Sequence, residues 1–207
     1  MKKFIASIVL LLAIQLIGFS QSFDLQKLLK ENKLVTSNGK IIPLTDSKKS
    51  GVSMQGIAWI KDASFSKGVI EVDLRGKDVF QKSFIGIAFH GVDTLTYDLV
   101  YFRPFNFRAE DPIRKIHAVQ YVSHPEWPWD KLREERNGIY EKGIDPAPAA
   151  TDWVHARIEV GDKQIKVFVN RSKTPSLVVD KLNDRKDGMI GLWNEGLDGD
   201  FANLSIK

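Results

Sequence analysis

The stretch Glu71-Val-Asp73-Leu-Arg75 carries two carboxylates two residues apart. Residues at that spacing share one face of a β-strand, so Glu71 and Asp73 are expected to point the same way. Paired carboxylates are the machinery of retaining glycoside hydrolysis, in which one is the nucleophile and another the acid and base. The next position on that face holds Arg75, which cannot donate a proton at neutral pH. An amphipathic strand with charge pairs across its ladder is the simpler interpretation.

Histidine supplies a second route to chemistry. The four histidines are His90, His117, His124 and His155, and none has a partner four residues away. With no cysteine in the chain either, the sequence signals no zinc site. A histidine beside a carboxylate is a candidate general base. There is no Gly-x-Ser-x-Gly elbow to support a serine hydrolase. The candidate catalytic residues are therefore His117, Glu71 and Asp73.

A segment between residues 123 and 151 combines prolines, charges and four aromatic or imidazole side chains without sheet alternation. A loop of this length in a compact domain is usually functional or disordered, and the aromatic content favours order. Trp127 and Trp129 flank Pro128, which keeps the backbone extended, so the two indoles can point to opposite sides. A short helical turn ending at Gly138 follows. One hypothesis makes the segment a lid over a sheet face with ligand between them; the other makes it a simple cover for an apolar face.

Several predicted strands carry a face that mixes aromatic rings with arginine, histidine and carboxylates. Sugar rings lie on aromatic faces through their C–H patches, and their hydroxyls take directional hydrogen bonds from such polar groups. A solvated outer face is the alternative for any one strand. The predicted ligand-binding residues are Tyr101, Arg103, Tyr121, His124, Trp127, Trp129, Arg133, Arg136 and Tyr140.

The elements that position these residues are predicted to be almost all strands. About a dozen short stretches alternate with period two and are separated by Gly, Asp and Asn turns, which predicts a β-sandwich or barrel. Residues 23–32 form the exception, a short helix with Asp24 or Ser22 near its start. Asn38-Gly39 predicts a two-residue hairpin. A chain of 207 residues suits one sizeable domain.

The first twenty residues have the pattern of a secretory signal. Lys2 and Lys3 precede an apolar run from Phe4 to Ile17, and Gly18 and Ser20 are the small residues before a predicted cut ahead of Gln21. We therefore expect residues 1–20 to be a signal peptide, 21–50 a lead-in helix and hairpin, and 51–207 the sandwich. The mature protein would be periplasmic or extracellular, with no membrane segment and no lipid anchor on cysteine.

Charge excludes one class of partner. The formal net charge of +4 falls to +2 without Lys2 and Lys3, and the remaining basic residues are scattered. Nucleic-acid binding requires a concentrated basic face. No cofactor is expected. Asp198 and Asp200, in a Gly/Asp-rich stretch, are candidates for a structural calcium, although such stretches are more often turns.

From about Gly51 onward the chain resembles the concanavalin A-like lectin/glucanase superfamily, on the stretches "GVIEVDLRG", "DWVHARIEVGDKQIKVFVN" and "GMIGLWNEGLDGDFANLSI". The resemblance implies a two-sheet jelly-roll β-sandwich. Gly138-Ile139-Tyr140, Pro146-Ala147-Pro148 and Asp152-Trp153 also look like the secreted 3-keto-disaccharide hydrolase family, near the laminin-G-like group. The superfamily's glucanases carry Glu-x-Asp-x-Glu, and Arg75 stands where the last Glu would be.

Fold does not determine function, so three hypotheses follow. The first is an exported carbohydrate-binding module that recognises a glycan on the concave sheet under the 123–151 loop. The second is a hydrolase or lyase acting on a (keto-)disaccharide or other sugar derivative, as the family resemblance implies. The third is an inert structural sandwich. The sequence leaves the sugar and the oligomeric state open.

Overall fold

The computed structural model describes residues 20–36, 39–45 and 48–207. Within them the chain forms thirteen strands, three short α-helices and one 3-10 turn, so the predicted all-β fold is confirmed. The predicted signal peptide, apart from Ser20, and Asn38 lie outside the described residues. No helix in the described part of the chain is long and apolar enough to cross a membrane.

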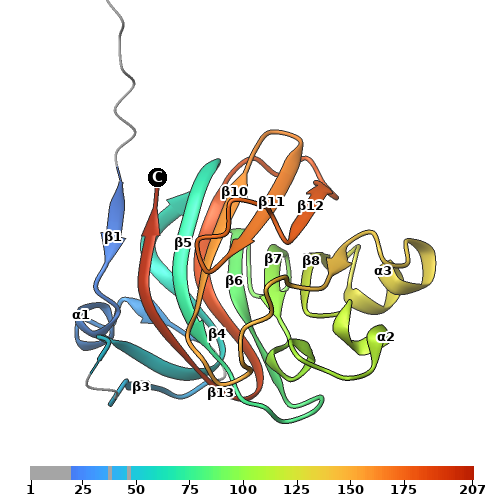
Figure 1. Cartoon of the computed structure of the whole chain (residues 1–207). Helices are drawn as coiled ribbons and strands as arrows, with labels where there is room; N and C mark the ends of the chain where they lie inside the picture. Colours follow the sequence, from blue (N-terminus) through green and yellow to red (C-terminus); the bar gives the residue numbers. More distant parts are fainter. Residues whose placement is uncertain (1–19, 37–38, 46–47) are drawn as a thin grey trace, which may run out of the picture.

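The strands form two layers (Figure 1). One, called here the β5 layer, contains β12 (Leu177–Asp180), β11 (Gln164–Val169), β10 (Val154–Val160) and β5 (Gly68–Arg75). The other, the β7 layer, contains β6 (Ser83–Gly91), β7 (Tyr97–Phe102), β8 (Val119–His124) and β9 (Glu141–Lys142). The named neighbours pair antiparallel in that order.

Two long strands, β4 (Gly51–Phe65) and β13 (Gly188–Ile206), join the layers. The first part of β13 pairs with β6 as far as Gly196, and from Asp200 onward β13 pairs with β5. The register against β4 shifts between Asn194 and Gly199, where the strand passes from one layer to the other. Irregularities of this kind let a strand bend around a sandwich.

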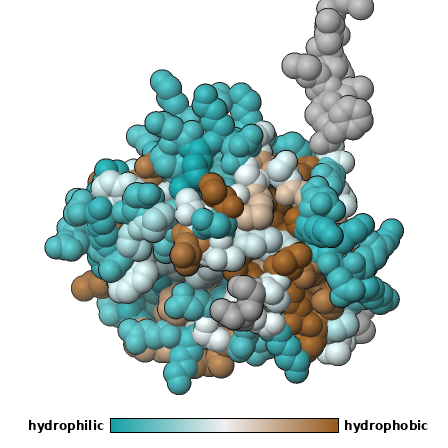
Figure 2. Space-filling model, turned by 180° about the vertical axis from the view of Figure 1, so that it is seen from behind, coloured by the Kyte–Doolittle hydropathy of each residue, from teal (hydrophilic) through white to brown (hydrophobic). Residues whose placement is uncertain are grey.

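The N-terminal elements pack along the edge of β4. Helix α1 (Leu25–Lys30) is capped by Asp24, whose carboxylate accepts from the Lys27 N–H. Strands β2 (Leu34–Val35) and β3 (Ile41–Pro43) each pair with β4. The long edge of β4 thus offers both segments a partner. The predicted Asn38-Gly39 hairpin includes Asn38, which lies outside the described residues, and it stays a prediction. Hydrophobic side chains gather on this side of the molecule (Figure 2).

The segment after β8 closes the outer edge of the β7 layer. Helix α3 (Trp129–Glu135) lies beside β8 (Figure 1), and β9 adds a short strand to the same sheet. Leu132, Tyr140 and Ile144 from this segment are buried in the core. The predicted helical turn is present as α3, which ends at Glu135 and not at Gly138. The lid hypothesis needs correction, because this segment extends the sheet sideways and fills its edge.

Strand β7 is buried on both faces, which is why its burial does not alternate. Its register with β8 pairs Asp98 with Ser123 and Val100 with Tyr121, and these side chains face the opposite layer. Tyr97, Leu99 and Tyr101 then face outward, as the sequence alternation predicted. The outward face is the one that the candidate site uses.

A fully buried carboxylate, Asp98, organises the interior between the layers. It accepts hydrogen bonds from His90 Nδ1 at 2.9 Å, from the Tyr121 hydroxyl at 2.9 Å and from Arg185 at 2.9 Å. Asn183 donates a further bond at 2.6 Å. Burial alone would raise the pKa of Asp98, but the His90 hydrogen bond and the Arg185 charge outweigh it and hold the pKa below its ordinary value. The network ties the β12–β13 connection to β7 and β8.

Replacing Asp98 by asparagine should remove a pH-dependent part of the stability. A carboxyl whose folded pKa is lowered stabilises the fold above its unfolded pKa of about 3.9 and loses that effect as the pH falls below it. The neutral-pH loss in Asp98→Asn should be about 3 kcal/mol, because Arg185 is left without its partner. Unfolding in urea, followed by circular dichroism between neutral and acidic pH, measures both. A wild-type minus variant difference that stayed constant down to strongly acidic pH would contradict this role.

Candidate functional site

Aromatic side chains cover the outer face of the β7 layer and its neighbours β13 and β4. We call the surface formed by Trp59, Tyr97, Trp193, Tyr101 and Phe84 the aromatic face. The ring of Trp59 contacts Tyr97 edge-on at 5.9 Å between centroids, and Tyr101 contacts Trp193 at 5.4 Å. Trp59, Tyr97 and Tyr101 are buried, whereas Trp193 and Phe84 are partly exposed.

Glycines make room for these rings on the sheet. A Cβ at Gly91 would lie 2.5 Å from the Trp59 ring, and one at Gly86 would lie 2.7 Å from the Cβ of Tyr101. Gly86 pairs with both Tyr101 and Trp193 across the ladders, so these two rings meet above it. Residues without side chains thus let the rings lie close to the backbone.

A polar group of six residues adjoins the Tyr101 end of this surface. We call it the arginine–glutamate cluster; its members are Tyr101, Arg103, His117, Gln120, Arg133 and Glu141. The Tyr101 hydroxyl donates to the Gln120 side chain at 2.7 Å, and Arg103 donates to both. The register places Gln120 opposite Tyr101 and Glu141 opposite Gln120. All six therefore meet where β7, β8 and β9 run side by side.

Glu141 is the hub of the cluster, with only 2% of its surface exposed. Arg133 donates to its two oxygens at 3.2 and 3.0 Å, and Arg103 donates at 3.3 Å. His117 Nδ1 lies 2.8 Å from Glu141 Oε2, without hydrogen-bond geometry. Burial alone would raise the pKa of Glu141, but the hydrogen bond from Arg133 and the charge of Arg103 hold it below its ordinary value. The carboxylate is therefore kept ionised.

Tyr101 is kept neutral in the same cluster. Burial raises the pKa of its hydroxyl to about 12, even though the Arg103 charge acts in the opposite direction. A neutral phenol is a hydrogen-bond donor, and here that donor is committed to Gln120. The partly accessible members of the cluster are Arg133 and His117, whose side chains are 36% and 13% exposed.

The structure brings together four of the residues predicted from sequence: Tyr101, Arg103, His117 and Arg133. It adds Gln120, Glu141, Trp193 and Phe84, which sequence reasoning missed. Gln120 and Glu141 had no aromatic or histidine signal, and their position depends on strand register. Phe84 and Trp193 are in stretches that the sequence predicts as strands. The sequence did not show that the two rings lie on the same face, because that depends on how β6 pairs with β13.

Other predicted ligand-binding residues lie elsewhere. Tyr121 is fully buried between the layers, because the register pairs it with inward-facing Val100. Tyr140 packs beside it, with ring centroids 6.2 Å apart. Both are core residues, which corrects their assignment to a sheet face open to ligand.

The other predicted residues of the segment 123–151, called here the aromatic loop, mostly contact one another. Trp127 packs against the core, and Arg136 lies 3.9 Å above its ring while donating to the Tyr140 hydroxyl. Trp129 points outward, with 49% of its surface exposed and Arg133 at 5.1 Å from its ring. The two indoles flanking Pro128 thus point to different environments, as expected. His124 contacts Tyr97 at the other end of the aromatic face, with its pKa lowered by burial.

The two predicted catalytic carboxylates belong to the outer face of the β5 layer, away from His117. Asp73 accepts from Lys49 and Asn203 at 2.7 Å and from His155 at 2.8 Å. Burial opposes ionisation of Asp73, but these hydrogen bonds hold its pKa far below the ordinary value. Glu71 pairs with Lys207. The structure does not assemble His117, Glu71 and Asp73 into one site, and the interpretation as a charge-paired strand accounts for the two carboxylates.

The calcium candidates are also engaged by cations. Asp200 pairs with Arg75 at 2.9 Å, and Asp198 lies 3.6 Å from Lys77. Among the residues that the structure describes, no group of three or more His, Cys, Asp or Glu could hold a metal ion. Calcium binding stays a prediction.

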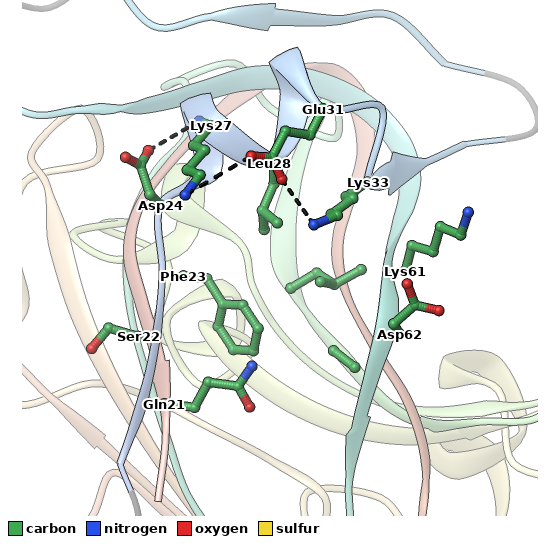
Figure 3. Close-up of a pocket in the computed structure, with 12 residues that line it drawn as sticks. Gln21, Ser22, Phe23, Asp24, Lys27, Leu28, Glu31, Lys33, Lys61 and Asp62 are labelled. Carbon is green, nitrogen blue, oxygen red and sulfur yellow. Dashed lines mark hydrogen bonds and ion pairs between the residues drawn. The ribbon is translucent and has the colours of Figure 1, made fainter.

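A hollow of about 380 Å³ lies between β1 (Gln21–Phe23), α1 and β4 (Figure 3). Phe23, Leu28 and Ile60 line it with apolar surface, and an ion pair between Glu31 and Lys33 at 2.9 Å stands at its rim. Glu31 also lies 3.9 Å from Lys27. Its lining residues belong neither to the aromatic face nor to the arginine–glutamate cluster. Strand β4 contributes to both the hollow and the aromatic face, but with different residues.

Comparison with solved structures agrees with this architecture. The chain is similar to the carbohydrate-binding module CBM66 from Bacillus subtilis, with a TM-score of 0.59 and 16% identity over 84% of this chain and 96% of that one. A Bacillus subtilis protein with a galectin-like fold gives 0.53 and 12%, over 82% and 86%. The VIP36 exoplasmic/lumenal domain, in its Ca²⁺/Man3GlcNAc-bound form, gives 0.50 and 9%, over 82% of each chain.

The chain has a lectin-like fold. These likenesses agree with the concanavalin A-like sandwich that the sequence resemblance implied. No protein-family model and no curated protein sequence matches the chain.

Replacing Glu141 by glutamine, a side chain of similar size without the negative charge, should destabilise the protein strongly. Glu141→Gln leaves Arg103 buried without its counter-charge, which should lower the free energy of unfolding by about 3 kcal/mol. The matched control is Glu134→Gln, an exposed position on α3, expected to change stability by less than about 0.5 kcal/mol. Urea unfolding at neutral pH measures both, and equal effects would show that the cluster does not depend on this charge.

Proposed function

We propose that this protein binds carbohydrate on the aromatic face. The observation that carries the proposal is the position of the partly exposed rings of Trp193 and Phe84 beside the arginine–glutamate cluster. A sugar presents C–H patches that pack on an aromatic ring and hydroxyls that need hydrogen-bonding partners. Both kinds of contact are available at this point of the surface.

The two outer faces of the sandwich differ in a way that supports this choice. On the β5 layer the charged groups are paired with one another, and Arg75 and Lys49 lie over the two-ring system of Trp153 at 4.6 and 5.2 Å. That face resembles ordinary solvated surface laced with ion pairs. On the β7 layer the rings are in contact with one another, and the cations are gathered at one end.

The similar structures add weight at the level of fold. They include a carbohydrate-binding module and a lumenal domain in a Ca²⁺/Man3GlcNAc-bound form. A fold can host many functions, so the site carries the argument and the fold agrees with it. The runner-up is a hydrolase or lyase acting on a sugar derivative. It would need a proton donor at the cluster, and Glu141 is held ionised by its arginines.

Trp193→Ala should weaken glycan binding by about tenfold or more, because it removes the exposed ring against which a sugar would pack. Trp153→Ala, on the opposite outer face, is the matched control and should leave affinity unchanged. Isothermal calorimetry against glycans that bind the wild-type protein measures both, with circular dichroism to check folding. Equal loss in the two variants, or loss only in Trp153→Ala, would place the site elsewhere.

The same glycans should be recovered intact after incubation. If products form, and if folded His117→Ala no longer forms them, the protein is a hydrolase or lyase and the binding proposal is wrong. His117 is chosen because it is the accessible imidazole of the cluster. No binding and no turnover across a broad panel would favour the inert sandwich.

We propose further that the protein is exported. The basic start, short apolar run and small residues before Gln21 support this, and β1 begins at that residue. Expression of the full chain in a bacterial host should yield a secreted or periplasmic product that begins at Gln21. Mass spectrometry of the intact product decides the point, and an uncut chain retained with the cells would contradict it.

A further inference from the structure

Further aromatic rings continue the aromatic face beyond Phe84. Phe84 contacts Phe105 at 5.4 Å between centroids, and Phe105 contacts Phe80 at 5.6 Å, both edge-on. Phe84 also lies 6.3 Å from Tyr101. We call the whole series the aromatic track; in order it consists of Trp59, Tyr97, Trp193, Tyr101, Phe84, Phe105 and Phe80.

The track follows the direction of β6. Trp59 lies against Gly91 at the end of that strand, and Tyr101 and Trp193 flank Gly86 in its middle. Phe84 is the second residue of β6, and Phe80 precedes the strand. At about 3.3 Å per residue, the distance from Gly91 to Phe84 alone is roughly 23 Å. This is the length of the part from Trp59 to Phe84; the accessible part begins at Trp193, beside Gly86, and continues past Phe84 to Phe80.

Exposure selects the part of the track that a ligand can reach. Trp59, Tyr97, Tyr101 and Phe105 are buried and form its floor. Trp193 and Phe84 are partly exposed, and Phe80 is 52% exposed. Accessible rings thus occur in the middle of the track and at the Phe80 end, on three different segments of the chain.

Polar groups flank the accessible part along its length. The arginine–glutamate cluster stands beside Tyr101. At the far end Arg114 lies 4.3 Å from the Phe80 ring and donates to the Phe105 carbonyl at 2.8 Å. Hydrogen-bonding groups are thus present at two separate positions, each next to an exposed ring. A single sugar ring can occupy only one of them.

We propose that the track binds an extended glycan chain lying along β6, with Trp193 and Phe80 in separate subsites. This inference rests on the proposed carbohydrate-binding function and specifies its ligand as an oligosaccharide of several rings. Affinity then increases with chain length until the glycan spans both subsites. Loss of Phe80 affects only those glycans long enough to reach it.

The test is a calorimetric series from monosaccharide to hexasaccharide, using gluco-, manno- and xylo-oligosaccharides of defined linkage. For the preferred series, the hexasaccharide should bind at least about tenfold tighter than the disaccharide. Phe80→Ala should weaken hexasaccharide binding by roughly threefold to tenfold and leave disaccharide binding unchanged. Trp193→Ala should weaken both. Leu95→Ala, an equally apolar and 74% exposed position off the track, is the control and should change neither.

The outcomes separate the two proposals. Affinity independent of chain length, together with an inert Phe80→Ala, would overturn the extended-chain inference and leave the carbohydrate-binding proposal standing on Trp193. Absence of binding to every member of the series and to a wider glycan panel would overturn both. Phe80 is exposed, so its alanine variant is expected to fold, and circular dichroism checks this.

Discussion

Two buried carboxylates, one on each side of the β7 layer, determine where the surrounding cations must lie. Asp98 faces the interior and is matched by His90 and Arg185, and Glu141 faces outward and is matched by Arg103 and Arg133. A buried charge without such partners would cost several kcal/mol, so neither group of partners can move independently. The inner set anchors the β12–β13 connection. The outer set anchors the aromatic loop and creates the polar end of the candidate site.

The aromatic face depends on a second constraint, which is space at the backbone. Trp59 approaches Gly91 and Gly191, and the contact between Tyr101 and Trp193 is made above Gly86. Larger residues at these positions would push the rings outward and separate them. Because the rings lie close to the backbone, they bury one another, and Trp193 and Phe84 are the members of the aromatic face that stay partly exposed. The shape of the site therefore depends on these glycines as much as on the aromatic rings.

Alternation along single strands was enough to predict much of this arrangement. It assigned Tyr97 and Tyr101 to one face of β7, and Glu71 and Asp73 to one face of β5, and both assignments are confirmed. It could not predict how neighbouring strands align. A shift of one residue between β7 and β8 exchanges Gln120 for Tyr121 beside Tyr101, and register is set by tertiary packing. Glu141 is in a two-residue strand, which is too short to show any period.

The protonation states in the cluster bear on the choice between binding and catalysis. Glycoside hydrolysis needs a carboxyl group that is protonated at working pH, which proteins obtain by placing it in apolar surroundings without cations. Glu141 has the opposite environment, with two guanidinium groups within hydrogen-bonding distance. Tyr101 holds its proton too tightly to release it near neutrality. Groups whose protons do not move are suited to holding a ligand by fixed hydrogen bonds. His117 is the partly exposed imidazole of the cluster, so any catalytic activity on this face would have to depend on that residue.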